Sequence, residues 1–159
     1  MVRKRSPVPV AGTCSHMCGV GLAVILVGPF LTVLLASVTL TFQALFMTHG
    51  GFTTLGANIV SMGVVGSFAG YGAFRLARWM NLPLAASAFL AGLICDWATY
   101  TMTSFELASA LVGGQSFLTL LCMFMPVQIP LGLLEGFLTA AAVKFMVSRR
   151  PELLREGVS

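Results

Sequence analysis

The chain has 159 residues, of which 57% are hydrophobic and only 9% are charged, against roughly 25% charged residues in an ordinary soluble domain. From Ser6 to Phe74 there is no Asp, Glu, Lys or Arg, whereas one membrane crossing needs about 20 apolar residues. The composition excludes a water-soluble globular domain and predicts an all-α, polytopic integral membrane helical bundle.

The net charge of +4 does not indicate a nucleic-acid partner, because the basic residues form short clusters just outside the apolar runs. Such clusters are typical of the cytoplasmic ends of membrane helices. Arg75 and Arg78 are expected on the same side as Arg149 and Arg150, and the loops around His49 and Gly113 carry no lysine or arginine. We therefore predict a multi-pass protein of the cell (inner) membrane with a cytoplasmic C-terminus.

The first apolar stretch covers residues 17–47, and as one straight helix it would be about 46 Å long against a hydrocarbon core of about 30 Å. Gly28-Pro29 interrupts this stretch, and proline removes a backbone donor and clashes with the preceding turn. The sequence predicts a short helix over residues 17–27, followed by a full span over residues 30–47. Whether the short helix crosses the membrane or only enters it stays open.

Three further spans follow, which gives four full transmembrane helices plus one short N-terminal helix. The second span ends at Arg78, the third covers residues 84–111, and the last covers residues 116–147 with Pro126 and Pro130 predicting a kink. We divide the chain into an N-terminal polar loop (1–15), a transmembrane helical domain (16–148) and a cytoplasmic tail (149–159).

Small residues recur at four-residue spacing in two of the predicted spans, at Gly66 and Gly70 and at Gly132 and Gly136. Such pairs let helix backbones approach closely in lipid. We expect packing within this one chain, with contacts to another subunit as the second interpretation.

A compact polar segment precedes the first helix and contains Cys14, Ser15 and His16, with Cys18 following. Imidazole binds cobalt, nickel, zinc and copper, whereas the two thiols would favour zinc or copper if they were ligands. As an isolated pattern the segment favours loop packing over a metal site. His49, taken alone, is interpreted as a water-exposed helix-terminal residue, and Asn58 would line a cavity or bond a neighbouring helix.

One polar stripe is predicted along the third full span, where five residues recur at helical spacing: Asp96, Thr99, Tyr100, Thr103 and Glu106. Ionisable groups at such depth usually face a protein interior or a wet cavity. The stripe is interpreted as a path for protons or a cation, or equally as hydrogen bonding between helices. Glu135 raises the same question in the last span, and Gln128, two turns earlier on the same face, is its candidate partner.

The sequence contains no GxxxxGK[ST] phosphate loop, no His-Glu-x-x-His and no Gly-x-Ser-x-Gly. We predict no catalytic residues and no enzymatic activity for this chain.

Several longer motifs occur in one order along the sequence. They are Gly12-Thr-Cys-Ser-His16, Gly19-Val-Gly-Leu22, Gly28-Pro29, Phe42-Gln-Ala-Leu45, His49-Gly-Gly-Phe-Thr-Thr-Leu-Gly-Ala-Asn58, Ser61-Met62, Asp96-Trp-Ala-Thr-Tyr100 with Thr103-Ser104, Gln128-Ile-Pro130 and Glu135-Gly-Phe-Leu-Thr139. In these motifs the chain resembles the CbiM/NikM family, the cobalt and nickel substrate-binding membrane subunits of energy-coupling-factor (ECF) ABC transporters.

The resemblance implies a subunit that captures a divalent metal at the outer face and works with three other kinds of subunit. These are a transmembrane coupling subunit, cytoplasmic ATPase subunits and a small accessory membrane subunit. Family members hold the metal with nitrogens from an N-terminal Met-His segment and from one later histidine, which aligns with His16. His49, Asn58, Cys14 and Ser15 are candidate supporting residues. Relative to the family, this sequence is expected to lack the Met-His segment and the first two helices. The alternatives are that a separate chain supplies this part, that the start of the sequence is placed too late, or that the gene is broken.

The resemblance favours import of cobalt for cobalamin synthesis, because Gly-Thr-Cys-Ser-His and Thr-His-Gly-Gly are similar to the cobalt members. Transported Co²⁺ or Ni²⁺ is then the ligand, and no permanently bound cofactor is expected. The alternatives are a nickel uptake subunit, a truncated membrane scaffold that binds no metal, and an ion-coupled permease that uses Asp96, Glu106 and Glu135 as a proton path.

Overall fold

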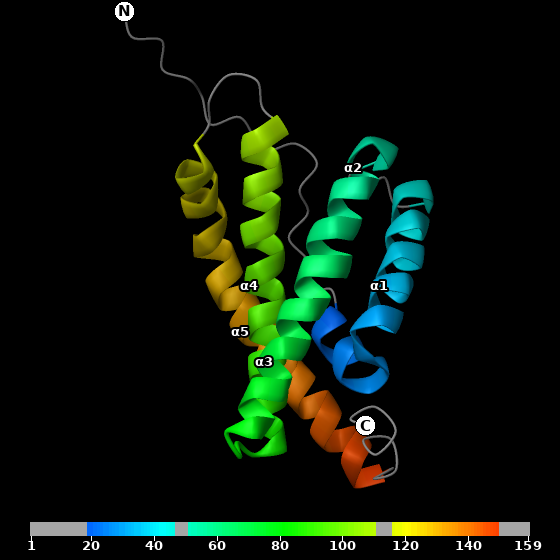
Figure 1. Ribbon diagram of the computed structural model, residues 1–159, viewed down its shortest axis with the longest axis vertical. Coiled ribbons are helices and arrows are strands. Elements are labelled where there is room, and N and C mark those ends of the chain that lie inside the picture. The colour runs from blue at the N-terminus through cyan, green and yellow to red at the C-terminus, as the bar shows by residue number, and fades with distance from the viewer. Residues whose placement is uncertain (1–18, 47–50, 111–115, 150–159) are drawn as a thin grey trace, which may run out of the picture.

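The computed structural model describes residues 19–46, 51–110 and 116–149, and every element in these ranges is helical. The elements in chain order are α1 (Val20–Phe46), α2 (Gly51–Asn58), the π-helix η1 (Ile59–Gly66), α3 (Ser67–Trp79), α4 (Leu84–Ala110) and α5 (Phe117–Arg149). Because α2, η1 and α3 follow one another without a break, they form one long run (Figure 1). The predicted all-α class is confirmed.

Four helical runs are long and apolar enough to cross a membrane, at 27, 28, 27 and 33 residues. Successive runs alternate in direction, since α1 leaves its bend upward in Figure 1, α3 points down, α4 up and α5 down. Large apolar side chains such as Phe30, Phe137 and Phe145 are exposed, as expected where lipid replaces water. The described residues therefore contain four helices able to span a membrane, as predicted.

The predicted break in the first apolar stretch lies at Gly28, whose backbone angles of φ 80° and ψ 169° are not helical. The part before the break packs inside the bundle, where Val24 and Ile25 contact Phe74 and Val143. The part after it lies at the edge of the bundle (Figure 1). Residues 20–27 form only about 12 Å of helix, too short for a hydrocarbon core of about 30 Å. The described part of this short helix alone is therefore shorter than one membrane span.

Close backbone contacts hold the short part of α1 and the helix α5 against α4 around Gly92. A Cβ atom added to Gly21 would lie 2.7 Å from the Gly92 Cα, and one added to Gly92 would lie 3.0 Å from the Gly136 Cα. Gly66 and Gly70 make similar approaches to α4 at Thr99 and Ala91. These contacts confirm that the predicted small-residue pairs pack within this chain.

The π-helix η1 was not predicted from the sequence. It occupies the middle of the second span and buries Ser61, Gly63 and Gly66. Its wider turn changes the register between α2 and α3, and π-helical turns are frequent at functional sites. The last span is helical throughout, from Phe117 to Arg149, with Pro126 and Pro130 inside it.

Gly28→Ala is expected to lower the free energy of unfolding by about 1–3 kcal/mol, since the backbone region of Gly28 is essentially restricted to glycine. A Cβ at Gly28 meets nothing within 4 Å, so the loss would arise from the backbone alone. Gly56→Ala is the matched control, because Gly56 lies inside α2 with nothing within 4 Å of an added Cβ, and it should gain about 0.5–1 kcal/mol. Equal unfolding midpoints of the two variants in detergent would contradict the break at Gly28.

Gly92→Ala should destabilise the bundle by about 1–3 kcal/mol, the usual cost of overpacking a tight contact. The added methyl group would lie 2.8 Å from the Thr139 hydroxyl oxygen and 3.0 Å from the Glu135 carbonyl oxygen. Gly72→Ala is the control, because nothing lies within 4 Å of that position. Thermal unfolding in detergent measures both, and a Gly92→Ala variant as stable as Gly72→Ala would show that the helices are not this close.

Candidate functional site

Four of the predicted site residues, Cys14, Ser15, His16 and His49, lie outside the described residues. Their assignment stays a prediction. The remaining candidates lie on α4, on α5 and at the junction of α2 with η1.

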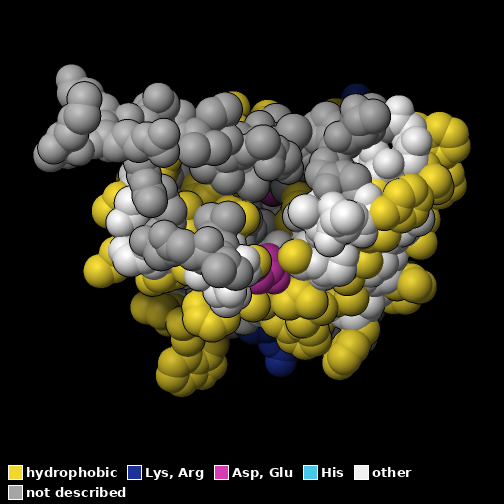
Figure 2. Space-filling model, turned by 90° about the horizontal axis from the view of Figure 1, so that it is seen from above, with side chains coloured by type: hydrophobic (Ala, Val, Ile, Leu, Met, Phe, Trp, Pro, Cys, Tyr) yellow, Lys and Arg dark blue, Asp and Glu magenta, His cyan; other side chains and the backbone are white. Residues whose placement is uncertain are grey.

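The polar stripe of α4 faces the interior of the bundle, as predicted. Asp96 is 4% exposed and Thr99 and Tyr100 are each 5% exposed, while Thr103 and Glu106 are half-buried. The side chains of the stripe are therefore most buried around Asp96 and become more exposed toward the upper end of α4. Figure 2 looks down on this end and shows acidic side chains between apolar ones near its middle.

A second polar face meets the stripe from α5, where Gln128, Glu135 and Thr139 are at most 4% exposed. They recur at helical spacing together with Gly132 and Gly136, which lets this face pack closely on α4. The structure thus places Gln128 and Glu135 on one buried face, as the sequence predicted. It also adds Thr139, which lies one turn beyond Glu135 and could have been found from that spacing.

Asp96 and Glu135 form a pair of buried carboxyl groups across the α4–α5 seam. Their carboxyl groups interact electrostatically, and each is at least 96% shielded from solvent, with 4% and 3% exposure. Ionisable side chains are rare inside membrane-spanning helices and mostly face the bundle interior. This pair is the most unusual electrostatic feature of the described part of the chain.

Gly132 brings two unsatisfied polar atoms together beside this pair. A Cβ at Gly132 would lie 2.6 Å from the Trp97 Nε1 atom and 2.9 Å from the Asp96 Oδ2 atom. Both of these buried atoms have no hydrogen-bond partner. Trp97 was not singled out from the sequence. Its indole approaches Gly132 of the facing helix α5, and the sequence alone does not show which residues of two helices face each other.

The hydroxyl groups of the stripe bond within α4. Thr99 donates to the Cys95 carbonyl at 2.8 Å and Thr103 donates to the Thr99 carbonyl at 2.9 Å. A hydroxyl group has one proton, so neither of these threonines donates to a carboxyl group. The interpretation that threonines of the stripe donate hydrogen bonds to carboxyl groups of other helices is therefore wrong for Thr99 and Thr103.

A smaller polar contact links α4 to η1 near the upper end. Ser61 is fully buried and its hydroxyl donates to the Ala57 carbonyl at 3.0 Å, and the Glu106 side chain of α4 lies near the same hydroxyl. Asn58 is half-buried at the start of η1 and makes no capping hydrogen bond with its side chain. The π-helix therefore presents Ser61 to α4, while Asn58 lies one turn earlier along the same span.

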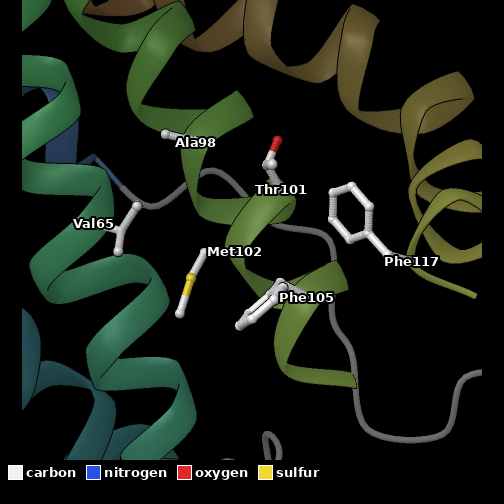
Figure 3. A pocket seen from close by; sticks show the side chains of 6 residues that line it. All are labelled: Val65, Ala98, Thr101, Met102, Phe105 and Phe117. Carbon is white, nitrogen blue, oxygen red and sulfur yellow. The ribbon is translucent and has the colours of Figure 1, made fainter. Parts of the chain in front are cut away.

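An apolar groove lies on the opposite face of α4, with a volume of about 400 Å³. Figure 3 shows its lining, which consists of Val65, Ala98, Thr101, Met102, Phe105 and Phe117. The one polar group among them, the Thr101 hydroxyl, donates to the Trp97 carbonyl at 2.7 Å. The groove thus offers apolar contacts and is unsuited to a metal ion.

The described residues contain no group of three or more His, Cys, Asp or Glu side chains that could hold a metal ion. Within ranges 19–46, 51–110 and 116–149, the pair of Asp96 and Glu135 is the largest convergence of buried charge. A complete metal site would need further ligands from elsewhere.

This chain is similar to known proteins that are described as cobalt transport proteins. A family model described as "Cobalt uptake substrate-specific transmembrane region" (CbiM) matches residues 4–153. The cobalt transport proteins CbiM of Geobacter sulfurreducens and Sorangium cellulosum are each 53% identical to this chain over 152 residues, which cover 93% of it. The chain spans 44% of the length of the first relative and 68% of the second.

The fold agrees with this class as well. A solved structure described as a truncated transition metal transporter superimposes with a TM-score of 0.80 at 25% sequence identity. That superposition covers 87% of this chain and 70% of the other. A second transition metal transporter at 24% identity gives a TM-score of 0.81 and supports the fold alone.

Proposed function

Because the chain belongs to the CbiM family of cobalt uptake substrate-specific transmembrane regions, we propose that it is the substrate-specific membrane component of an ECF-type transporter importing Co²⁺ for cobalamin synthesis. The observation that carries this proposal is the family match over residues 4–153, together with four helices able to span a membrane. Nickel uptake is the alternative within the same family.

His16 is the proposed metal ligand of this chain. Imidazole nitrogen suits cobalt and nickel alike, and His16 lies in the Gly-Thr-Cys-Ser-His motif that carries the resemblance. A Met-His segment, from this polypeptide or from a separate fragment, would supply the remaining nitrogen ligands. His49, Asn58, Cys14 and Ser15 are proposed to support the site without binding the metal directly.

The proposed partners follow from the same family. The chain would deliver its metal through a transmembrane coupling subunit, with cytoplasmic ATPase subunits hydrolysing ATP and a small accessory membrane subunit completing the complex. The chain itself would carry out no catalysis.

His16→Ala is expected to reduce radiolabelled cobalt uptake to background in cells that express this chain with its coupling and ATPase subunits, since the ligand nitrogen would be lost. His49→Ala, at the only other histidine, should cause a smaller loss. Cys122→Ala is a control with uptake unchanged, because Cys122 is an exposed free thiol of α5. Membrane amounts of all variants are compared by immunoblot, and wild-type uptake by His16→Ala would overturn the assignment.

The same assay separates the alternatives when a Met-His segment is supplied as a separate chain. Cobalt uptake that depends on this segment supports a capture site completed in trans. Preference for ⁶³Ni over ⁵⁷Co would favour the nickel alternative. No uptake of either metal, with the protein present in the membrane, would favour a scaffold that binds no metal.

We further propose that the C-terminus lies in the cytoplasm of a cell whose inner membrane holds the protein. Arg78 and Arg149 lie in the last turns of α3 and α5, and both helices end at the lower side of Figure 1. Basic residues accumulate on the cytoplasmic side of membrane proteins.

A green fluorescent protein fused after Ser159 should therefore fluoresce, whereas alkaline phosphatase fused there should be inactive. Replacing Arg75, Arg78, Lys144 and Arg149 by Gln should weaken this preference. Active phosphatase at the C-terminus of the unmodified chain would reverse the proposed orientation.

A further inference from the structure

Two adjacent residues of α4 each bury a polar atom that has no hydrogen-bond partner. The Asp96 side chain is 4% exposed, and its Oδ2 atom makes no hydrogen bond. The Trp97 side chain is half-buried, but its Nε1 atom is shielded from solvent and also makes no hydrogen bond. Buried polar groups in native structures are almost always hydrogen-bonded, either to protein or to ordered water. Both atoms therefore require a partner inside the bundle.

The two atoms converge on one point of the facing helix α5. A Cβ atom added to Gly132 would lie 2.6 Å from the Trp97 Nε1 atom and 2.9 Å from the Asp96 Oδ2 atom. Glycine has only a hydrogen atom in this position, so no side chain of residue 132 separates the two atoms. Because both distances run to the same point, one small molecule beside Gly132 is within reach of both atoms.

The two atoms are complementary in their hydrogen-bonding chemistry. The indole Nε1 atom donates one hydrogen bond and accepts none, whereas a carboxyl oxygen of an ionised aspartate only accepts. A molecule that accepts one hydrogen bond and donates another satisfies both atoms at once. Water has this property, and buried water molecules typically make about three hydrogen bonds to polar groups that otherwise have no partner.

Nearby hydroxyl groups of α4 are already used within the helix. Thr99 donates to the Cys95 carbonyl at 2.8 Å, and Thr101 donates to the Trp97 carbonyl at 2.7 Å. Each hydroxyl group has a single proton, so neither threonine donates to Asp96. The hydrocarbon core of a membrane contains no hydrogen-bonding groups either, so lipid does not replace the missing partner.

We propose that Asp96 and Trp97 bind a water molecule beside Gly132, in the seam between α4 and α5. The water oxygen accepts the proton of Trp97 Nε1, and one water proton is donated to Asp96 Oδ2. An added Cβ at Gly92 would lie 3.0 Å from the Gly136 Cα, so the same seam is closed by backbone contact nearby. The bound water fixes the orientation of both side chains, and this role does not depend on transport of a metal.

The sequence offers two reporters for this site. Asp96 is the only aspartate, and Trp97 is one of only 2 tryptophans. The full chain is labelled with [4-¹³C]aspartate and with ¹⁵N in the indole rings, placed in nanodiscs, and studied by rotating-frame NOE spectroscopy. Trp79, at the end of α3, is 80% exposed, so Trp79→Phe leaves the Trp97 indole signal as the only one.

A cross-peak between the Trp97 indole proton and water is expected, with the sign of a through-space contact. A cross-peak with the sign of rapid proton exchange would show that the indole is open to bulk water, and would overturn the proposal. Contact of the indole proton with the Asp96 carboxyl carbon, and none with water, would show a direct hydrogen bond and would overturn it as well. Absence of every such contact has the same consequence.

Gly132→Ala is expected to reduce the water cross-peak to background, because its Cβ would lie 2.6 Å from Trp97 Nε1 and displace the water molecule. Gly72→Ala is the control with an unchanged cross-peak, since nothing lies within 4 Å of a Cβ at that position. A cross-peak of full intensity in Gly132→Ala would contradict the placement of the water beside Gly132. If Gly132→Ala does not fold, the spectra of the chain with glycine at this position still decide the proposal.

Discussion

The contact of Gly92 with glycines on two other helices is the constraint on which the rest of the bundle depends. Gly92 meets both Gly21 of α1 and Gly136 of α5. Lipid chains are as apolar as leucine side chains, so helices in a membrane gain little from apolar burial and depend instead on close van der Waals contact. Gly92 allows that contact with two helices at once.

This contact also explains why acidic groups are buried. Asp96 lies one turn along α4 from Gly92, and Glu135 is adjacent to Gly136 on α5, so closing the glycine seam carries both carboxyl groups inside. Water and lipid are excluded together there, whereas the outward faces expose large apolar side chains such as Phe30 and Phe137. At this seam the bundle thus buries acidic side chains while its outward faces expose large apolar ones.

The sequence predicted those features that depend on a single helix. The third span was expected over residues 84–111 and is observed at Leu84–Ala110, and the Gly28 break follows from Gly-Pro chemistry. The η1 turn and the approach of Trp97 and Asp96 to Gly132 were not predicted. These depend on the register between neighbouring helices, which hydrophobic periodicity within one helix does not contain. His16 stays a prediction, because it lies outside the described residues.

Gly92 also connects the α4–α5 seam to the helix that follows the proposed capture motif. The short part of α1 begins at Val20 and touches Gly92 with Gly21, and His16 precedes Gly19 by only three residues in the chain. The helix that follows the proposed capture motif is therefore packed one turn from Asp96. A shift of α4 relative to α5 would also move the support of that helix, because Gly92 contacts both. The packing of α4 on α5 and the position of this helix are thus expected to be linked, because a closely packed interior transmits a displacement rather than absorbing it.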